Sequence, residues 1–141
     1  MEHNTIQQYK EQSINTMTPS ELLLLLYDEL VKNLMRCGLA LDQKEYEVAE
    51  AAADKSLDII RYLDDTLDDQ YPISRELHKL YDYFGYQLAR VKIGRNKKVL
   101  DDLRPMVSEL RESFRIAEKN VAEEAERAAE KAARKVPAGP G

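Results

Sequence analysis

Side chains that commonly bind metals or transfer protons are scarce in this chain of 141 residues, which has two histidines, His3 and His78, and one cysteine. Helical bundles that bind two metal ions use Glu-x-x-His pairs, whose members lie one turn apart on the same helix face. Glu76 precedes His78 by only two residues, so these two side chains point to different faces of a helix. The sequence therefore predicts no such metal site, and we expect neither a metal nor another cofactor.

The other reactive groups also lack a catalytic pattern. Cys37 cannot form an intramolecular disulfide, because it is the single cysteine, and we interpret it as a small residue of the core. The acidic pairs Asp64–Asp65 and Asp68–Asp69 are interpreted as the solvated end of a helix. The sequence contains no glycine-rich phosphate-binding loop. It therefore predicts a protein without enzymatic activity.

The overall composition limits the classes of partner. Hydrophobic residues make up 43% of the chain and charged residues 33%, which is typical of a globular domain. A net charge of −5 disfavours nucleic acid as a partner, since phosphate binding requires clustered lysine and arginine. No apolar run approaches the length of about 18 residues that a membrane span needs, and the first residues lack a signal pattern. We therefore expect a cytoplasmic protein that neither binds nucleic acid nor inserts into a membrane.

Proline, glycine and capping residues divide the chain into four predicted helices. Thr18 is a good N-cap, Pro19 suits the first helical position, and Glu21 would complete a capping box. Gly94 would supply the C-cap of the third helix, and Asn96 would cap the fourth. The predicted helices span residues 19–42, 45–69, about 74–94, and from the Asn96 cap to at least residue 120.

Pro105 falls within the last of these predicted helices. Proline removes one backbone hydrogen bond and clashes with the preceding turn, so it either kinks the helix or marks its true start. The sequence leaves both alternatives open.

Each predicted helix has apolar residues at helical spacing, and the connections are short. Four such helices are typical of an antiparallel up-and-down bundle, so the predicted fold class is all-α. We expect an N-terminal arm at 1–17, a four-helix bundle at 18–121, and a charged, alanine-rich helical extension with a flexible tail at 122–141. The extension pairs glutamate with arginine at i,i+4 spacing but has no large apolar face.

The first predicted helix has more apolar surface than one core needs. Its motif SELLLLLYDEL contains five consecutive leucines, which at about 100° per residue point all the way round a helix. Leu24, Val31 and Met35 form a second stripe beside the core-facing seam, whereas Leu22 and Leu25 point elsewhere.

Two interpretations of this surplus stay open. The second stripe could pack between two neighbouring helices of the bundle, which accounts poorly for Leu22 and Leu25. Alternatively, the leucines form an exposed groove that binds a helix of another chain. Leu57 and Ile60, which flank the seam of the second helix, would then belong to the same binding surface.

The N-terminal arm has isolated apolar residues in a polar segment. Ile6 and Tyr9 are three residues apart, and Ile14 follows them. Such a segment is too polar to fold alone, so it either lacks fixed structure or docks on the groove until a partner displaces it.

Several motifs, taken in chain order, are those of a known family. They are Ile6-x-x-Tyr9, T-P-S-E-L at 18–22, L-L-Y-D at 25–28, L-Y-D-Y-F at 80–84 and E-L-R-x-x-F at 109–114. The specific part is the pair of Leu-Tyr-Asp motifs, which are 54 residues apart on different predicted helices. Over about residues 6–120, the chain resembles the flagellar secretion chaperones of flagellin, the FliS family.

The resemblance implies an antiparallel helical bundle that binds the C-terminal segment of newly made flagellin in the cytoplasm. Binding would cover a segment that drives filament polymerisation and so prevent premature assembly. The complex would then dock at the gate of the flagellar type III export apparatus, and other flagellar regulatory proteins are further expected partners. Ile6 and Tyr9 match the family's functional isoleucine and tyrosine positions, in an arm that covers part of the apolar surface.

Four features depart from the family pattern. Glu29 replaces the glycine that usually follows the first Leu-Tyr-Asp motif, and Phe114 replaces a tryptophan. Neither Pro105 nor the charged tail belongs to the pattern. None of these departures removes the apolar surface.

The predicted function is that of an export chaperone, and the alternative is a helical scaffold or adaptor that self-associates through its apolar stripes and ignores flagellin. Tyr27 and its counterpart Tyr81 are also interpreted as core tyrosines with exposed hydroxyls. The predicted partner-binding residues are Ile6, Tyr9, Ile14, Leu22, Leu24, Leu25, Tyr27, Val31, Met35, Leu57 and Ile60.

Overall fold

The computed structural model describes residues 16–135, most of which belong to four helices. The helices are α2 (Pro19–Asp42), α3 (Tyr46–Asp65), α4 (Ile73–Gly94) and α5 (Lys97–Lys135). No strand occurs within residues 16–135, so the predicted all-α class is confirmed. In the same range, no helix is both long and apolar enough to cross a bilayer.

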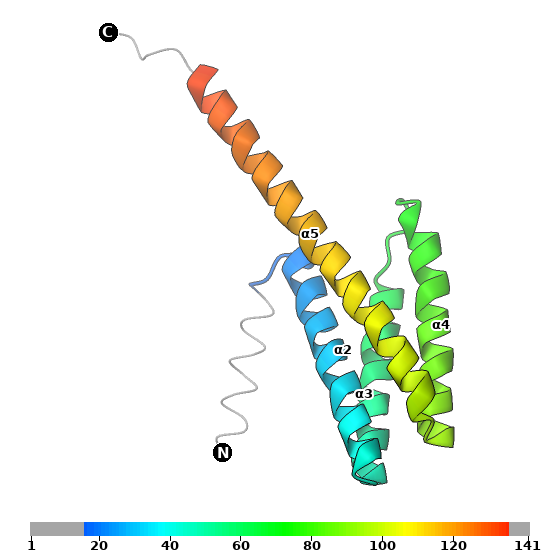
Figure 1. The fold of residues 1–141 in the computed structure, drawn as a ribbon. Helices are drawn as coiled ribbons and strands as arrows, with labels where there is room; N and C mark the ends of the chain where they lie inside the picture. The colour runs from blue at the N-terminus through cyan, green and yellow to red at the C-terminus, as the bar shows by residue number, and fades with distance from the viewer. Residues whose placement is uncertain (1–15, 136–141) are drawn as a thin grey trace.

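The helices form a ring in which each contacts two neighbours. α2 contacts α3 and α5, and α4 contacts the same two helices from the opposite side. Successive helices run in opposite directions, which confirms the antiparallel up-and-down bundle (Figure 1). Figure 1 also shows α5 crossing the bundle and continuing well beyond the start of α2.

The start of α2 follows local side-chain chemistry. The Glu21 N–H donates a hydrogen bond to Thr18 Oγ1 at 3.2 Å, and Pro19 occupies the first turn as predicted. The Glu21 side chain makes no return bond to the cap in the described structure, so only half of the expected capping box forms.

α3 ends at Asp65, before the predicted end at residue 69. The Thr66 hydroxyl donates a hydrogen bond to the Tyr62 carbonyl oxygen in the last turn of the helix, at 2.9 Å. Asp68 Oδ1 then accepts from the Gln70 N–H at 3.0 Å and closes a turn. These side-chain bonds compete with the helical ones and stop the helix early.

α4 ends at Gly94, but the predicted C-cap role of this glycine is wrong. Arg95 is the residue in the left-handed conformation, with φ 51°, and no glycine of the described chain has a positive φ. The Arg95 guanidinium lies over the Tyr46 ring, 3.7 Å from its centroid, and this contact helps to hold the conformation. The Asn96 cap is confirmed, since its Oδ1 accepts from the Val99 N–H at 3.2 Å.

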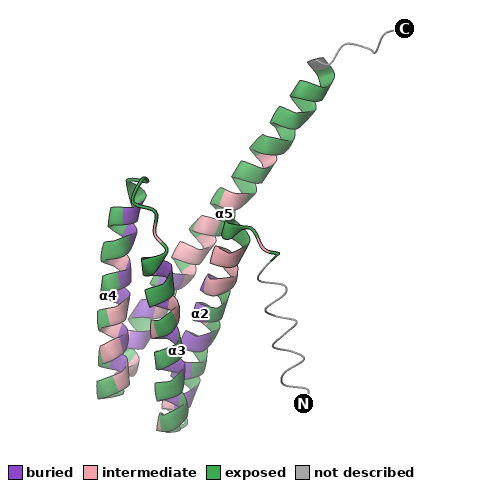
Figure 2. Cartoon of the chain, turned by 180° about the vertical axis from the view of Figure 1, so that it is seen from behind, coloured by how far each residue is buried: buried purple, intermediate pink, exposed green. Residues whose placement is uncertain are grey.

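Pro105 does not mark the start of the last helix. α5 begins at Lys97 and runs through the proline. Because proline has no N–H, the Asp101 carbonyl loses its helical donor. The helix continues through the alanine-rich segment, where residues 122–134 are exposed apart from half-buried Glu123 (Figure 2). Most of the expected arm and the last residues of the tail lie outside residues 16–135, so the division into three parts stays a prediction.

The core is formed by the inward faces of all four helices (Figure 2). Leu30, Phe84, Leu88 and Leu100 are fully buried, and each side chain of this size stabilises the fold by about 1.5–3 kcal/mol. Cys37 belongs to the same core, as predicted, and burial raises the pKa of its thiol. In the first half of α3 the buried residues are small, namely Ala49, Ala52, Ala53 and Ser56, which lets this part of the helix lie close to its neighbours.

A hydrogen bond joins the two Leu-Tyr-Asp motifs across the bundle. The hydroxyl oxygens of Tyr27 on α2 and Tyr81 on α4 are 2.6 Å apart, and the side chains are 0% and 2% exposed. The expectation of exposed hydroxyls is therefore wrong. Both rings contribute apolar area to the core, and each hydroxyl gives the other a partner that water would otherwise supply.

Tyr81→Phe should lower the free energy of unfolding by about 1–3 kcal/mol, because the Tyr27 hydroxyl would stay buried without a partner. Urea unfolding followed by circular dichroism measures this change. The double variant Tyr27→Phe/Tyr81→Phe should lose less than the sum of the two single variants, since it leaves no orphaned hydroxyl. Strictly additive losses would show that the two hydroxyls are not coupled.

The tyrosine pair should also make the fold sensitive to alkali. Burial raises the pKa of both phenols above the ordinary value, and the proximity of Tyr81 raises that of Tyr27 further. The folded state therefore keeps protons that the unfolded chain releases above about pH 10, so the free energy of unfolding should fall as the pH rises past that value. Phenolate absorbance should show both groups ionising only on unfolding, and ionisation within the folded state would contradict this.

Candidate functional site

An apolar groove lies where the first turns of α2 meet the end of α3 and the start of α4. We call it the end groove, and its volume is about 410 Å³. Leucines from three helices and an aromatic ring from α5 line it. They include Leu22, Leu23, Leu26, Leu63, Leu77 and Phe114. A depression of this size and composition suits the apolar face of a helix from another chain.

The five consecutive leucines of α2 divide into two groups. Leu23 and Leu26 pack against the core, as the seam predicts. Leu22, Leu24 and Leu25 are half-buried and are not among the residues packed against the core. Leu22 lines the end groove, so apolar surface extends from this groove onto the first turns of α2. This arrangement favours the interpretation of an exposed binding surface for these three leucines.

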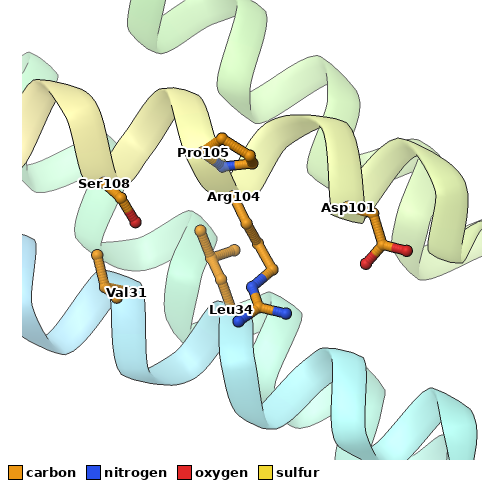
Figure 3. Close-up of a pocket in the computed structure, with 6 residues that line it drawn as sticks. All are labelled: Val31, Leu34, Asp101, Arg104, Pro105 and Ser108. Atoms are coloured by element: carbon orange, nitrogen blue, oxygen red, sulfur yellow. The ribbon is translucent and has the colours of Figure 1, made fainter.

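Val31 lies in a second groove, between α2 and α5, with a volume of about 280 Å³ (Figure 3). Val31 packs against the core, which is what the packing interpretation of the second stripe expects. Figure 3 shows Arg104 reaching from α5 toward Leu34 on α2, so a cation forms part of this groove. Met35, one turn further along α2, is 44% exposed. The second stripe is therefore covered at Val31 and open at Met35.

Two predicted binding residues are buried in the core. Tyr27 is 0% and Ile60 4% exposed, so neither presents a surface to a partner in this structure, contrary to expectation. Ile60 shares the helix face of Ser56 and Leu63, which packing against α2 turns inward. Leu57 is half-buried in a third groove, between α3 and α4, of about 320 Å³. Ile60 lines this third groove too, which is separate from the end groove, and the part of both residues in partner binding stays a prediction.

The three predicted binding residues of the arm, Ile6, Tyr9 and Ile14, lie outside the described residues. Their role stays a prediction. Met17, which follows them, lines the end groove.

The aspartate of the first Leu-Tyr-Asp motif forms an ion pair at the surface. Asp28 Oδ1 is 3.3 Å from Arg111 Nη1, so the motif on α2 is tied to the E-L-R-x-x-F motif on α5. Both side chains are partly exposed, and an ion pair of this kind contributes about 0–1 kcal/mol. Its main effect is on the relative position of the two helices.

The aspartate of the second motif belongs to a cluster that sequence reasoning missed. Asp82 lies 3.5 Å from Nε2 of His78, and Asp64 of α3 lies 2.6 Å from Nδ1 of the same ring. These carboxylates raise the pKa of His78, and the hydrogen bond to Asp64 contributes most. The i,i+4 spacing of His78 and Asp82 was visible in the sequence, but the approach of Asp64 depends on the packing of α3 against α4.

Comparison with known proteins adds independent information. The family model described as "Flagellar protein FliS" matches residues 2–121. The flagellar secretion chaperone FliS of Bacillus subtilis (strain 168) is 28% identical over 109 residues, which cover 77% of this chain and 82% of that protein. A solved structure described as "Crystal structure of flagellar chaperone from bacteria" has a TM-score of 0.69 and covers 85% of this chain and 99% of its own. At 20% identity, this last similarity supports the fold alone.

The family match covers the bundle with both Leu-Tyr-Asp motifs and stops where the alanine-rich extension begins. It agrees with the resemblance expected from the motifs. The chain therefore belongs to the FliS family of flagellar proteins, and its function is that of a flagellar secretion chaperone.

Proposed function

We propose that this chain binds the C-terminal segment of flagellin in the cytoplasm, prevents its premature polymerisation, and delivers it to the gate of the flagellar type III export apparatus. The main observation in support is the group of three α2 leucines, Leu22, Leu24 and Leu25, which the core does not take up. Membership of a secretion chaperone family supports the same role.

The binding mode follows from the shape of the surface. The end groove is a depression lined by Leu22 and next to Leu24 and Leu25 in the chain. An amphipathic helix can lay one apolar face into such a depression. Apolar side chains at i, i+3 or i+4, and i+7 of the partner would complete the burial of these leucines. Neither surface would then be available for aggregation or filament growth.

The proposed surface uses only part of the predicted residue set. Tyr27 and Ile60 are left out, because both are buried. In the described chain the proposed surface comprises Leu22, Leu24 and Leu25, with Val31 in the groove beside α5 and exposed Met35 as further contacts on α2. Leu57, in the groove between α3 and α4, is proposed as a separate contact. The arm residues Ile6, Tyr9 and Ile14 are proposed to cover part of this surface when flagellin is absent.

Leu25→Glu or Leu24→Glu should weaken binding of the C-terminal flagellin segment at least tenfold, about 1.4 kcal/mol, because the bound helix would desolvate a carboxylate. Isothermal titration calorimetry with flagellin from the same organism measures the affinity and stoichiometry. Ile93→Glu is the matched control, since Ile93 on α4 is 85% exposed and lines none of the three grooves described above. Unchanged affinity in folded Leu24 and Leu25 variants would place the binding surface elsewhere.

The same titration separates a chaperone from a self-associating scaffold. A chaperone should form a one-to-one complex with flagellin. A scaffold should show no heat of binding to flagellin, together with a molar mass that rises with its own concentration.

Ile6→Ala/Tyr9→Ala in the full chain should tighten flagellin binding. An arm that covers the groove leaves only a fraction of the molecules able to bind flagellin, and the apparent affinity falls in proportion to that fraction. Because the double variant weakens the contact of the arm, more molecules have an open groove and the apparent affinity rises. The comparison requires only wild type and the double variant in the same calorimeter. Weaker binding by the double variant would instead make the arm part of the flagellin site.

A further inference from the structure

Three side chains able to bind a metal converge on the outer face of α3 and α4. His78 and Asp82 lie one turn apart on α4, and Asp64 reaches them from the end of α3. One ligand atom from each residue lies within 4.8 Å of the other two. The cluster is at the surface, where the side chains of His78 and Asp82 are 55% and 69% exposed, so ions can reach it.

The two distances from the imidazole give the two carboxylates different roles. Nδ1 of His78 lies 2.6 Å from Asp64 Oδ1, a strong hydrogen bond in which the ring nitrogen donates. A neutral imidazole with its hydrogen on Nδ1 has a free lone pair on Nε2. That nitrogen lies 3.5 Å from Asp82 Oδ2, which is long for a hydrogen bond.

The longer distance suits two ligands of one metal ion. With zinc–ligand bonds of about 2.0–2.1 Å and tetrahedral angles, two ligand atoms lie about 3.4 Å apart. Histidine and aspartate are both zinc ligands, and the i,i+4 spacing on a helix brings them to the same face. The separation of Nε2 and Oδ2 therefore fits a zinc ion between them with little side-chain movement.

We propose that His78 Nε2 and the Asp82 carboxylate bind a Zn²⁺ ion at the surface of α4, and that Asp64 holds the imidazole from α3. A carboxylate on the second ring nitrogen fixes the tautomer and orientation of a ligating histidine and makes it a better ligand. Water would complete the coordination, so the site has open positions.

The surrounding charge favours a cation at this place. The charged groups that raise the pKa of the His78 imidazole are Asp64, Asp82 and Asp69, all acidic. Arg61 and Arg75 line the adjoining grooves without forming an ion pair with these carboxylates. In the described chain, neither Asp64 nor Asp82 forms an ion pair with a lysine or arginine. Carboxylates alone would suit Mg²⁺ or Ca²⁺ equally, but an imidazole ligand selects zinc and related transition metals.

Titration of the full chain with zinc chloride in a calorimeter tests the proposal. The same carboxylates also favour a proton on the ring, so the titration belongs at mildly alkaline pH, where the proton competes least. One equivalent of zinc should bind saturably, and magnesium chloride at equal concentration should neither bind nor compete. Zinc should also raise the midpoint of thermal unfolding, because it binds a site that only the folded chain assembles.

Four variants assign the roles. His78→Ala should abolish binding, and Asp82→Asn should weaken it at least about tenfold through loss of a ligand. Asp64→Asn should weaken it about 10–100-fold through loss of the orienting carboxylate. His3→Ala removes the chain's other imidazole and is the matched control, which should bind as wild type does.

Several outcomes would overturn the proposal. They are the absence of saturable zinc binding, full binding by His78→Ala, loss of binding in His3→Ala, or equal binding of magnesium. Nitrogen NMR of the His78 ring decides the geometry, since zinc should shift the Nε2 resonance. A metal shift at Nδ1, or wild-type affinity in Asp64→Asn, would overturn the role given to Asp64. Neither result depends on flagellin binding.

Discussion

A helix within a four-helix ring can bury only the faces that meet the core and its two neighbours, and the rest of the structure depends on this limit. In α2 the leucines point in every direction, so the ring takes up Leu23 and Leu26 and leaves Leu22, Leu24 and Leu25 half-buried outside the core. Leucine at such positions contributes less to the stability of the free bundle than a core leucine does, and it increases the tendency to aggregate. The surplus therefore makes physical sense in a protein that shares this surface with another chain.

The two Leu-Tyr-Asp motifs show how one short pattern serves different purposes in one fold. Their tyrosines meet inside the bundle, where a single hydrogen bond links α2 with α4. Their aspartates diverge at the surface, because Asp28 pairs with Arg111 of α5 and Asp82 pairs with His78 of its own helix. The tyrosines and aspartates of the Leu-Tyr-Asp motifs thus mainly fix the positions of the helices. The apolar surface at Leu22, Leu24 and Leu25 is the part proposed to bind a partner.

The histidine cluster and the end groove share their supporting helices. Leu63 and Leu77, which line the groove, are the chain neighbours of Asp64 and His78. Any interaction that holds Asp64 against His78 therefore also holds the end of α3 against the start of α4, and so sets the far wall of the groove relative to the α2 leucines. The packing that makes the groove is the same packing that assembles the cluster.

The sequence by itself determined what depends on neighbouring residues along the chain. Thr18 and Pro19 set the start of α2, Asn96 caps α5, and apolar spacing predicted four antiparallel helices, because caps and the helical period act over a few residues. It did not predict that Thr66 and Asp68 would end α3 early, or that Arg95 would take the left-handed conformation beside Tyr46. Only the tertiary structure decided that the tyrosine hydroxyls are buried, that Ile60 faces inward, and that Asp64 meets His78. These contacts join different helices, and they depend on the rotation of each helix about its axis, which the packing of all four helices sets together.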